Sequence, residues 1–244
     1  MALRFPLRRR VALWLAAIAL IAGGLAGWLG YASSRDSLRA AAFHHLTSLR
    51  ESRARCVEGW FEALRRTVST LAESPSTRDA LDAFRSALAA GVGPGGAQLE
   101  ADVRDWYAAQ LMPRFGAGPA PDAGTQAPAE ATAVALQHDY LVANEHPLGG
   151  KDALDRGARG TSYDDAHARH HPRLRTTSKR YGFYDLFLVD VATRRVIYTV
   201  FKESDFGVRL DQGAWPATGL ARAVDQALAD PTKGVHVIDY APYG

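Results

Sequence analysis

The sequence predicts an α+β protein with one transmembrane helix, a long helical region and then an antiparallel sheet that is incomplete at its C-terminus. Three observations predict this class. An apolar run without charge covers residues 11–32, apolar residues recur at helical spacing beyond it, and two segments between residues 185 and 201 are dense in β-branched and aromatic residues. The expected parts are a cytoplasmic tail (1–10), a transmembrane helix (11–32), an extracytoplasmic helical region (33–130) and an α/β domain (131–244).

The apolar run at residues 11–32 is long enough for a helix to cross the roughly 30 Å hydrocarbon core of a bilayer. Trp28 and Tyr31 lie where interfacial aromatic residues anchor such a helix. A cleaved signal peptide is the alternative, because residues 30–32 also fit a cleavage site. The run exceeds the usual apolar region of a signal peptide, about 7 to 15 residues, so an uncleaved anchor is favoured.

Charge predicts the orientation of this helix. The residues that follow the run have mixed sign, whereas four arginines precede it: Arg4, Arg8, Arg9 and Arg10. The positive-inside rule therefore predicts a cytoplasmic N-terminus and a main domain outside the membrane. Without these arginines 25 basic residues face 26 acidic ones, so the pI of about 9.1 reflects topology and gives no support to a nucleic-acid partner. Arginine far outnumbers lysine, which suggests a bacterial inner-membrane protein from a GC-rich genome.

A long helix with coiled-coil character is predicted beyond the membrane. Its stripe packs either on the domain's own core or on a second copy of the chain; it consists of Phe43, Leu46, Val57, Phe61, Leu64, Val68 and Leu71. Ser74-Pro75-Ser76 ends this helix. Further helices are expected at about 77–90, 99–115, 131–142, 162–172 and 218–229, with Ser162 as a cap and Pro172 as a stop, and loops at 91–96 and 116–129.

A hairpin is predicted from residues 185–190 and 196–201, with a turn at 192–194. Leu186 and Leu188 would point to one face, and the residues between them to the other. Both faces are apolar, so both need cover: helices on one side, and loops or a pocket on the other. A third strand is expected at 235–240. It would end the sheet abruptly, so we expect the sequence to be the N-terminal portion of a longer protein.

The sequence predicts no catalytic residue, no metal and no cofactor. It has no phosphate-binding loop, nucleophile elbow or zinc-protease helix. Asp205-Phe206-Gly207 matches a kinase tripeptide, but the other kinase motifs are missing. Asp164, His167 and His171 lie at helical spacing and could share a metal, although histidines on a helix surface are common and no fourth ligand is evident.

Candidate ligand-binding residues lie at the ends of the hairpin: Tyr184, Tyr198, Lys202 and Asp205. Aromatic and charged groups together are typical of a pocket for a polar small molecule. The alternative is that the tyrosines fill the core and the charges are solvated strand ends.

Several stretches resemble a known class of domain. They are residues 136–149, 150–152 and 170–172, and above all 181–190 and 197–207. They resemble the extracytoplasmic sensor region of bacterial transmembrane receptors, with methyl-accepting chemotaxis proteins as the best match. Sensor histidine kinases and membrane cyclases carry similar input domains.

This resemblance implies a Cache-like, PAS-related sensor domain on a long membrane-connected helix, followed in the family by a second transmembrane helix and a cytoplasmic signalling module. The implied partners are a small molecule or a periplasmic binding protein, and a second copy of the chain in a homodimer. The paired arginine, tryptophan and aspartate motif of amino-acid-binding Cache domains has no counterpart that we can place. A membrane-tethered enzyme and a membrane-tethered scaffold are the alternatives.

Overall fold

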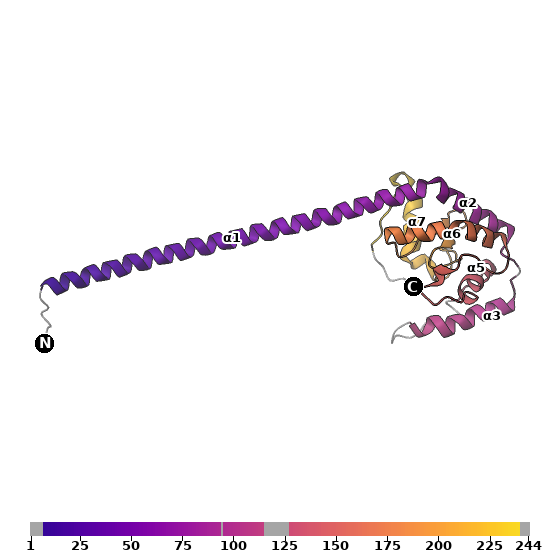
Figure 1. Ribbon diagram of the computed structural model, residues 1–244, viewed down its shortest axis with the longest axis horizontal. Coiled ribbons are helices and arrows are strands. Elements are labelled where there is room, and N and C mark those ends of the chain that lie inside the picture. Colours follow the sequence, from indigo (N-terminus) through magenta and orange to yellow (C-terminus); the bar gives the residue numbers. More distant parts are fainter. Residues whose placement is uncertain (1–6, 94, 115–126, 240–244) are drawn as a thin grey trace. The chain divides into compact units, whose positions relative to one another are not determined.

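A computed structural model describes residues 7–93, 95–114 and 127–239 (Figure 1). The chain divides into two units, residues 1–65 and 66–244. The first consists of helix α1, Leu7–Glu73, which continues into the second and buries none of its residues. Its N-terminal part is long and apolar enough to cross a membrane. Ser74 then caps the next helix by accepting a hydrogen bond from the Thr77 amide, so the predicted helix end is confirmed.

The second unit is mainly helical. Its α-helices are α2 (Pro75–Ala90), α3 (Ala97–Trp106), α5 (Ala131–Gln137), α6 (Ser162–Tyr181) and α7 (Gly219–Ala229). Helices α3 and α5 each continue into a π-helical turn, Tyr107–Leu111 and His138–Val142, and short 3₁₀ turns lie at Met112–Arg114, Lys151–Ala153, Trp215–Ala217 and Pro231–Lys233. All five predicted helices are present. Most of the loop predicted at 116–129 lies outside the described residues.

Helix α6 corrects two predictions. Its N-cap is Thr161 rather than Ser162, because Thr161 and Asp164 form a reciprocal capping box. Pro172 does not end the helix, which continues to Tyr181 and stops at Gly182 with a φ of 69°. Proline removes one backbone hydrogen bond, but α6 buries side chains on both sides of Pro172, among them Leu174. This packing holds the helix together.

The sheet is an antiparallel hairpin of β1 (Phe187–Asp190) and β2 (Arg195–Thr199). Leu188 pairs with Tyr198 and Val189 pairs with Val196, so Ile197 is an extra residue in β2. This bulge brings two consecutive side chains, Ile197 and Tyr198, into one hydrophobic cluster.

The third predicted strand is wrong for residues 235–239, which form no strand; residue 240 lies outside the described residues. A strand needs a partner edge. The segment after Gly207 lies along the outer edge of β2 instead: the Val196 amide donates to the Val208 carbonyl at 2.9 Å, and the Leu210 amide donates to the Arg194 carbonyl at 2.8 Å.

Both faces of the hairpin are covered, as predicted. Leu186 and Leu188 face a cluster built around Phe84 of α2 and side chains of α6, and Figure 1 shows these two helices side by side. Phe187 and Val189 face a second cluster, formed with the 208–210 segment and α7. A third cluster joins α3 to α5. The unit therefore has helices against one face of the hairpin, and a loop with α7 against the other.

Candidate functional site

The four ligand-binding candidates from the sequence do not lie together. Tyr198, Lys202 and Asp205 are buried, whereas Tyr184 is 71% exposed. Tyr184 stacks on Phe201 at the surface and donates a hydrogen bond to Glu203. Tyr198 and Lys202 lie together, with the Lys202 Nζ 5.1 Å from the centre of the Tyr198 ring.

Lys202 lies in the core without exposure to solvent. Its Nζ donates to the carbonyls of Thr199 and Val200, both at 3.0 Å, and lies 3.3 Å from Nδ1 of His171. The backbone of Lys202 has a φ of 61°, a left-handed conformation that turns the chain at the end of β2. Burial lowers the pKa of Lys202 to about 7, against the opposing charge of Asp185.

His171 completes this buried network as a neutral imidazole. Its Nε2 lies 2.7 Å from the Asp152 carbonyl, which only accepts, so this nitrogen carries the proton. Its Nδ1 then accepts from the hydroxyl of Tyr198 at 2.7 Å. Burial and the charge of Lys202 lower the pKa of His171 to about 3. The network ties α6 to the end of β2 and to the Asp152 segment.

The residues considered as metal ligands have other roles. The carboxylate of Asp164 accepts from the hydroxyl of Tyr140 and from the cap of α6. His167 stacks on His171, with ring centroids 4.3 Å apart, and its Nδ1 lies 2.7 Å from the Asp155 carbonyl. Nε2 of His167 is buried without a hydrogen-bond partner. Within residues 7–93, 95–114 and 127–239, no three side chains of the metal-binding types converge.

Asp205 belongs to a neighbouring polar network. Its charge acts on Tyr107, which donates a hydrogen bond to Gln137 at 2.8 Å. The amide of Gln137 in turn donates to the carbonyls of Ser204 and Phe206. These contacts fix the segment after Lys202 against α3 and α5.

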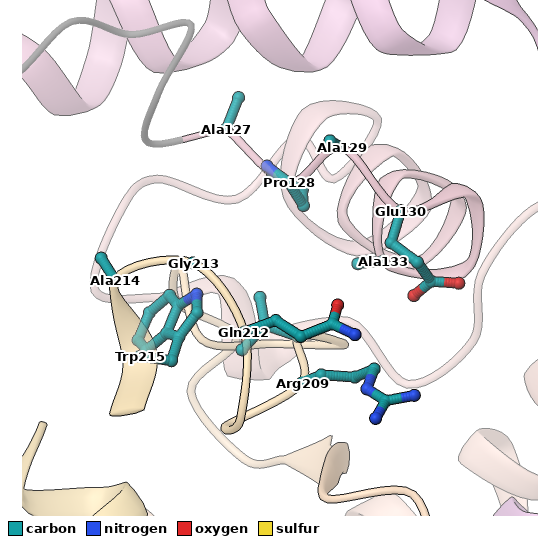
Figure 2. A pocket seen from close by; sticks show the side chains of 11 residues that line it. Ala127, Pro128, Ala129, Glu130, Ala133, Arg209, Gln212, Gly213, Ala214 and Trp215 are labelled. Atoms are coloured by element: carbon teal, nitrogen blue, oxygen red, sulfur yellow. The ribbon is translucent and has the colours of Figure 1, made fainter. Parts of the chain in front are cut away.

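A half-open pocket of about 360 Å³ lies between the start of α5 and the loop before α7. Figure 2 shows the Trp215 ring on one side and the polar ends of Gln212, Arg209 and Glu130 on another. Ala133 and the backbone around Pro128 complete it. An aromatic surface beside a few polar groups is the usual composition of a small-molecule site.

Hydrogen bonds position the polar groups of this pocket. Arg209 forms a two-point ion pair with Asp211, at 3.1 and 2.8 Å. The Glu130 carboxylate pairs with Arg195 and accepts from the Thr132 amide. Burial acts to raise the pKa of Glu130, but the hydrogen bond and charge of Arg195 outweigh it and lower that pKa. The Gln212 side chain and the remaining N–H groups of Arg209 are the donors that a ligand would meet.

Arg195 pairs with Glu130 of this pocket and also lines a second groove, of about 630 Å³. The groove lies between α2 and the hairpin turn, and Arg195 is part of its wall. There Arg85 of α2 forms an ion pair with Asp190 of β1 at 3.1 Å. Asp190 pairs with Arg195 across the two strands, so two separate ion pairs and the strand pairing between them connect the first pocket to α2.

Sequence reasoning missed the pocket in Figure 2. None of Glu130, Arg209, Gln212 and Trp215 was among the predicted binding residues. The available signal was Trp215 itself, a large aromatic residue in a turn that also contains Gly213 and Pro216 rather than in an apolar run. Tryptophan is enriched at sites where one end of its side chain is apolar and the other is solvated.

Comparisons with models of protein families, with curated proteins and with solved structures find no match for this chain.

Proposed function

We propose that this chain is the extracytoplasmic input region of a bacterial transmembrane chemoreceptor, anchored in the inner membrane with its N-terminus in the cytoplasm. The observation that carries the proposal is helix α1, whose membrane-length apolar segment is continuous with a helix that reaches a folded unit with a half-open pocket. The resemblance to Cache-like sensor domains supports the same interpretation. An input region of a sensor histidine kinase or a membrane cyclase would use the same parts.

In this proposal the ligand is a small molecule bound in the pocket between α5 and the loop before α7. The donors Arg209 and Gln212 beside the Trp215 ring favour a molecule with an acceptor-rich or anionic group and an apolar body. The buried network of Lys202, His171 and Tyr198 stabilises the fold and does not bind the ligand. The proposal assigns no catalytic residue and no cofactor, and the receptor acts as a homodimer.

Signal transmission would pass from the pocket to α2 through two ion pairs and the strand pairing of Arg195 with Asp190 that lies between them. Glu130 holds Arg195 of β2, and Asp190 of β1 holds Arg85 of α2. Ser74 joins α2 directly to α1. A ligand that binds one arrangement of these elements a few kcal/mol more tightly than another shifts the population of helix positions.

The test is a ligand screen on the full chain in lipid nanodiscs. The panel contains small organic anions, cations and neutral molecules of matched size, read out by thermal shift and then by calorimetry. We expect one anionic class to stabilise the protein. Arg209→Ala or Gln212→Ala should weaken binding about ten-fold by removing a hydrogen bond to a charged group, while Arg222→Ala and Gln226→Ala on exposed positions of α7 leave it unchanged.

Three outcomes contradict the proposal. Equal binding to Arg209→Ala, Gln212→Ala and the unmodified chain places the ligand elsewhere. A flat screen with a folded chain and added periplasmic binding proteins favours the membrane-tethered scaffold. Turnover of a panel compound would instead favour the tethered enzyme.

A further inference from the structure

The exposed face of α6 carries a row of three arginines. Arg169, Arg173 and Arg180 are all exposed, and at 3.6 residues per turn they fall within an arc of about 40° around the helix axis. Along the axis they are spaced about 6 and 10 Å apart. The buried side chains of α6, such as His171 and Ser178, lie on the opposite side of the helix. The arginine row therefore faces solvent rather than the core.

Structural roles within the chain do not account for this row. Residues 166–184 contain no acidic residue, and within the described residues none of the three arginines forms an ion pair, whereas the two other basic residues of the segment pair with aspartates before α6. The helix dipole favours Arg180 in the last turn, but Arg173 lies two turns earlier and Arg169 three. Like charges four residues apart, as at Arg169 and Arg173, lower the stability of a helix. Concentrated positive charge of this kind attracts an anionic partner.

Two exposed tyrosines lie just beyond the arginine row. Tyr181 is the last residue of α6 and is 51% exposed, and Tyr184 is 71% exposed. Tyr181 stacks on Phe183, and Tyr184 stacks on Phe201 with ring planes 7° apart. The Tyr184 hydroxyl donates to Glu203 at 2.7 Å, which fixes this ring in place. The face of an aromatic ring carries partial negative charge and attracts polarised C–H groups, so a fixed, exposed ring is a stacking surface for a sugar ring.

We propose that α6 docks an acidic polysaccharide, with the arginine row on its carboxylates and the Tyr184 ring on one of its sugar rings. Arginine suits this role because its planar guanidinium donates two N–H groups to one carboxylate. The carboxylates of such a polymer recur along a line, as the three arginines do along α6. The inference rests on the proposed function only for the side of the membrane, because it places α6 outside the cytoplasm, where acidic polysaccharides of the cell envelope occur.

Two other anionic partners fit the row less well. A folded protein partner needs an apolar centre in its interface, but the exposed positions of the row, together with Thr176 between them, carry no apolar side chain. A bilayer attracts basic residues only within the Debye length of about 8 Å. Residues 33–65 of α1 lie between the predicted span and the second unit, and a helix of that length measures about 50 Å. A soluble acidic polymer meets neither difficulty.

Binding of polygalacturonate to the full chain in phosphatidylcholine nanodiscs tests the proposal, with dextran as the uncharged polymer. The chain should bind polygalacturonate and not dextran. Replacing the row by glutamine should weaken binding at least about ten-fold through the loss of charged hydrogen bonds, in the combined variant Arg169→Gln, Arg173→Gln and Arg180→Gln. Urea unfolding should be unchanged, because these side chains are exposed. The matched control removes the same charge at the N-terminus and should bind normally: Arg8→Gln, Arg9→Gln and Arg10→Gln. Equal losses in the two variants, or no binding by the unmodified chain, would overturn the proposal.

Further variants test how the polymer is held. Arg169→Lys with Arg173→Lys keeps the charge but removes the two-point contact, so binding should weaken several-fold; unchanged binding refutes recognition of the carboxylates by arginine.

Tyr184→Ala tests the sugar ring. It should weaken binding of polygalacturonate but not of polyglutamate, which has carboxylates and no sugar rings. Equal losses for both polymers refute stacking on the sugar. Tighter binding of polyglutamate, or of phosphatidylglycerol vesicles, than of polygalacturonate would assign the row to an acidic peptide or to the membrane instead. Polymer binding does not use the half-open pocket, so a flat small-molecule screen with intact polymer binding refutes only the sensor proposal.

Discussion

Replacing Lys202 by methionine should remove a pH dependence of stability that this one side chain causes. Lys202 is fully buried, and its Nζ is held by two backbone carbonyls and His171. Among the described residues no carboxylate forms an ion pair with it. Burial therefore favours the neutral amine and lowers the pKa from 10.5 to about 7.

The number of protons bound at Lys202 in the folded and unfolded chains determines whether stability rises or falls with pH. Between the folded pKa of about 7 and the unfolded value of 10.5, the unfolded chain binds more protons at this residue than the folded chain does. The free energy of unfolding therefore rises with pH in this window, and the contribution is flat below it. Each pH unit in this window adds at most about 1.4 kcal/mol to the free energy of unfolding. A rise from pH 7 to about pH 9 therefore adds roughly 2 to 3 kcal/mol.

The measurement is urea unfolding of the full chain in mild detergent at several pH values across this window. Stability of the unmodified chain should increase with pH, and Lys202→Met should flatten the slope. Lys233→Met, at an exposed position, is the matched control and should retain the slope. The measurements stop at about pH 9, before the tyrosines of the unfolded chain ionise near pH 10, because above that pH the raised pKa values of the buried tyrosines reverse the trend. An unchanged slope in Lys202→Met would refute the reasoning.

Three further predictions concern a buried phenylalanine, a glycine that lies against α5, and the stability of the chain at acidic pH. Phe84→Ala should destabilise the second unit by about 3 to 5 kcal/mol in urea unfolding, because Phe84 is fully buried, whereas Tyr184→Ala at the surface should cost under about 0.5 kcal/mol. Gly207→Ala should lower the melting temperature more than Gly213→Ala: both have positive φ, but only at Gly207 would a Cβ come within 3.1 Å of the backbone of α5. The low pKa of His171 means that the unfolded chain binds more protons between about pH 6.5 and 3, so stability should fall with acidification in this range and fall less in His171→Gln.

Local signals predicted most of the secondary structure. Ser74-Pro75 ends one helix and begins the next because proline lacks an amide and serine caps the free ones. The hairpin followed from its β-branched residues, and the direction of Leu186 and Leu188 followed from strand alternation. Each of these depends on interactions between residues close in sequence.

The predictions of secondary structure that were wrong are those in which residues far apart in the sequence determine the local structure. Pro172 stays inside α6 because packing on both sides of it outweighs one lost hydrogen bond. Residues 235–239 resemble a strand, yet the outer edge of β2 is already paired with the segment after Gly207. Sequence pattern alone does not show which edge is free.

At the candidate site, too, local signals were not enough, because contacts between distant residues determine which side chains meet. Residue type suggested that Tyr198 and Lys202 line a ligand pocket, but the β2 bulge and the left-handed turn at Lys202 direct both into the core, where His171 meets them. The half-open pocket instead gathers Glu130 and Trp215, which are far apart in the chain. The sequence by itself determined the membrane-length helix, the order of the helices and the hairpin, because periodicity, capping and charge act locally. Only the tertiary structure decided which polar side chains are buried and which meet at a surface pocket, because that depends on packing between elements distant in sequence.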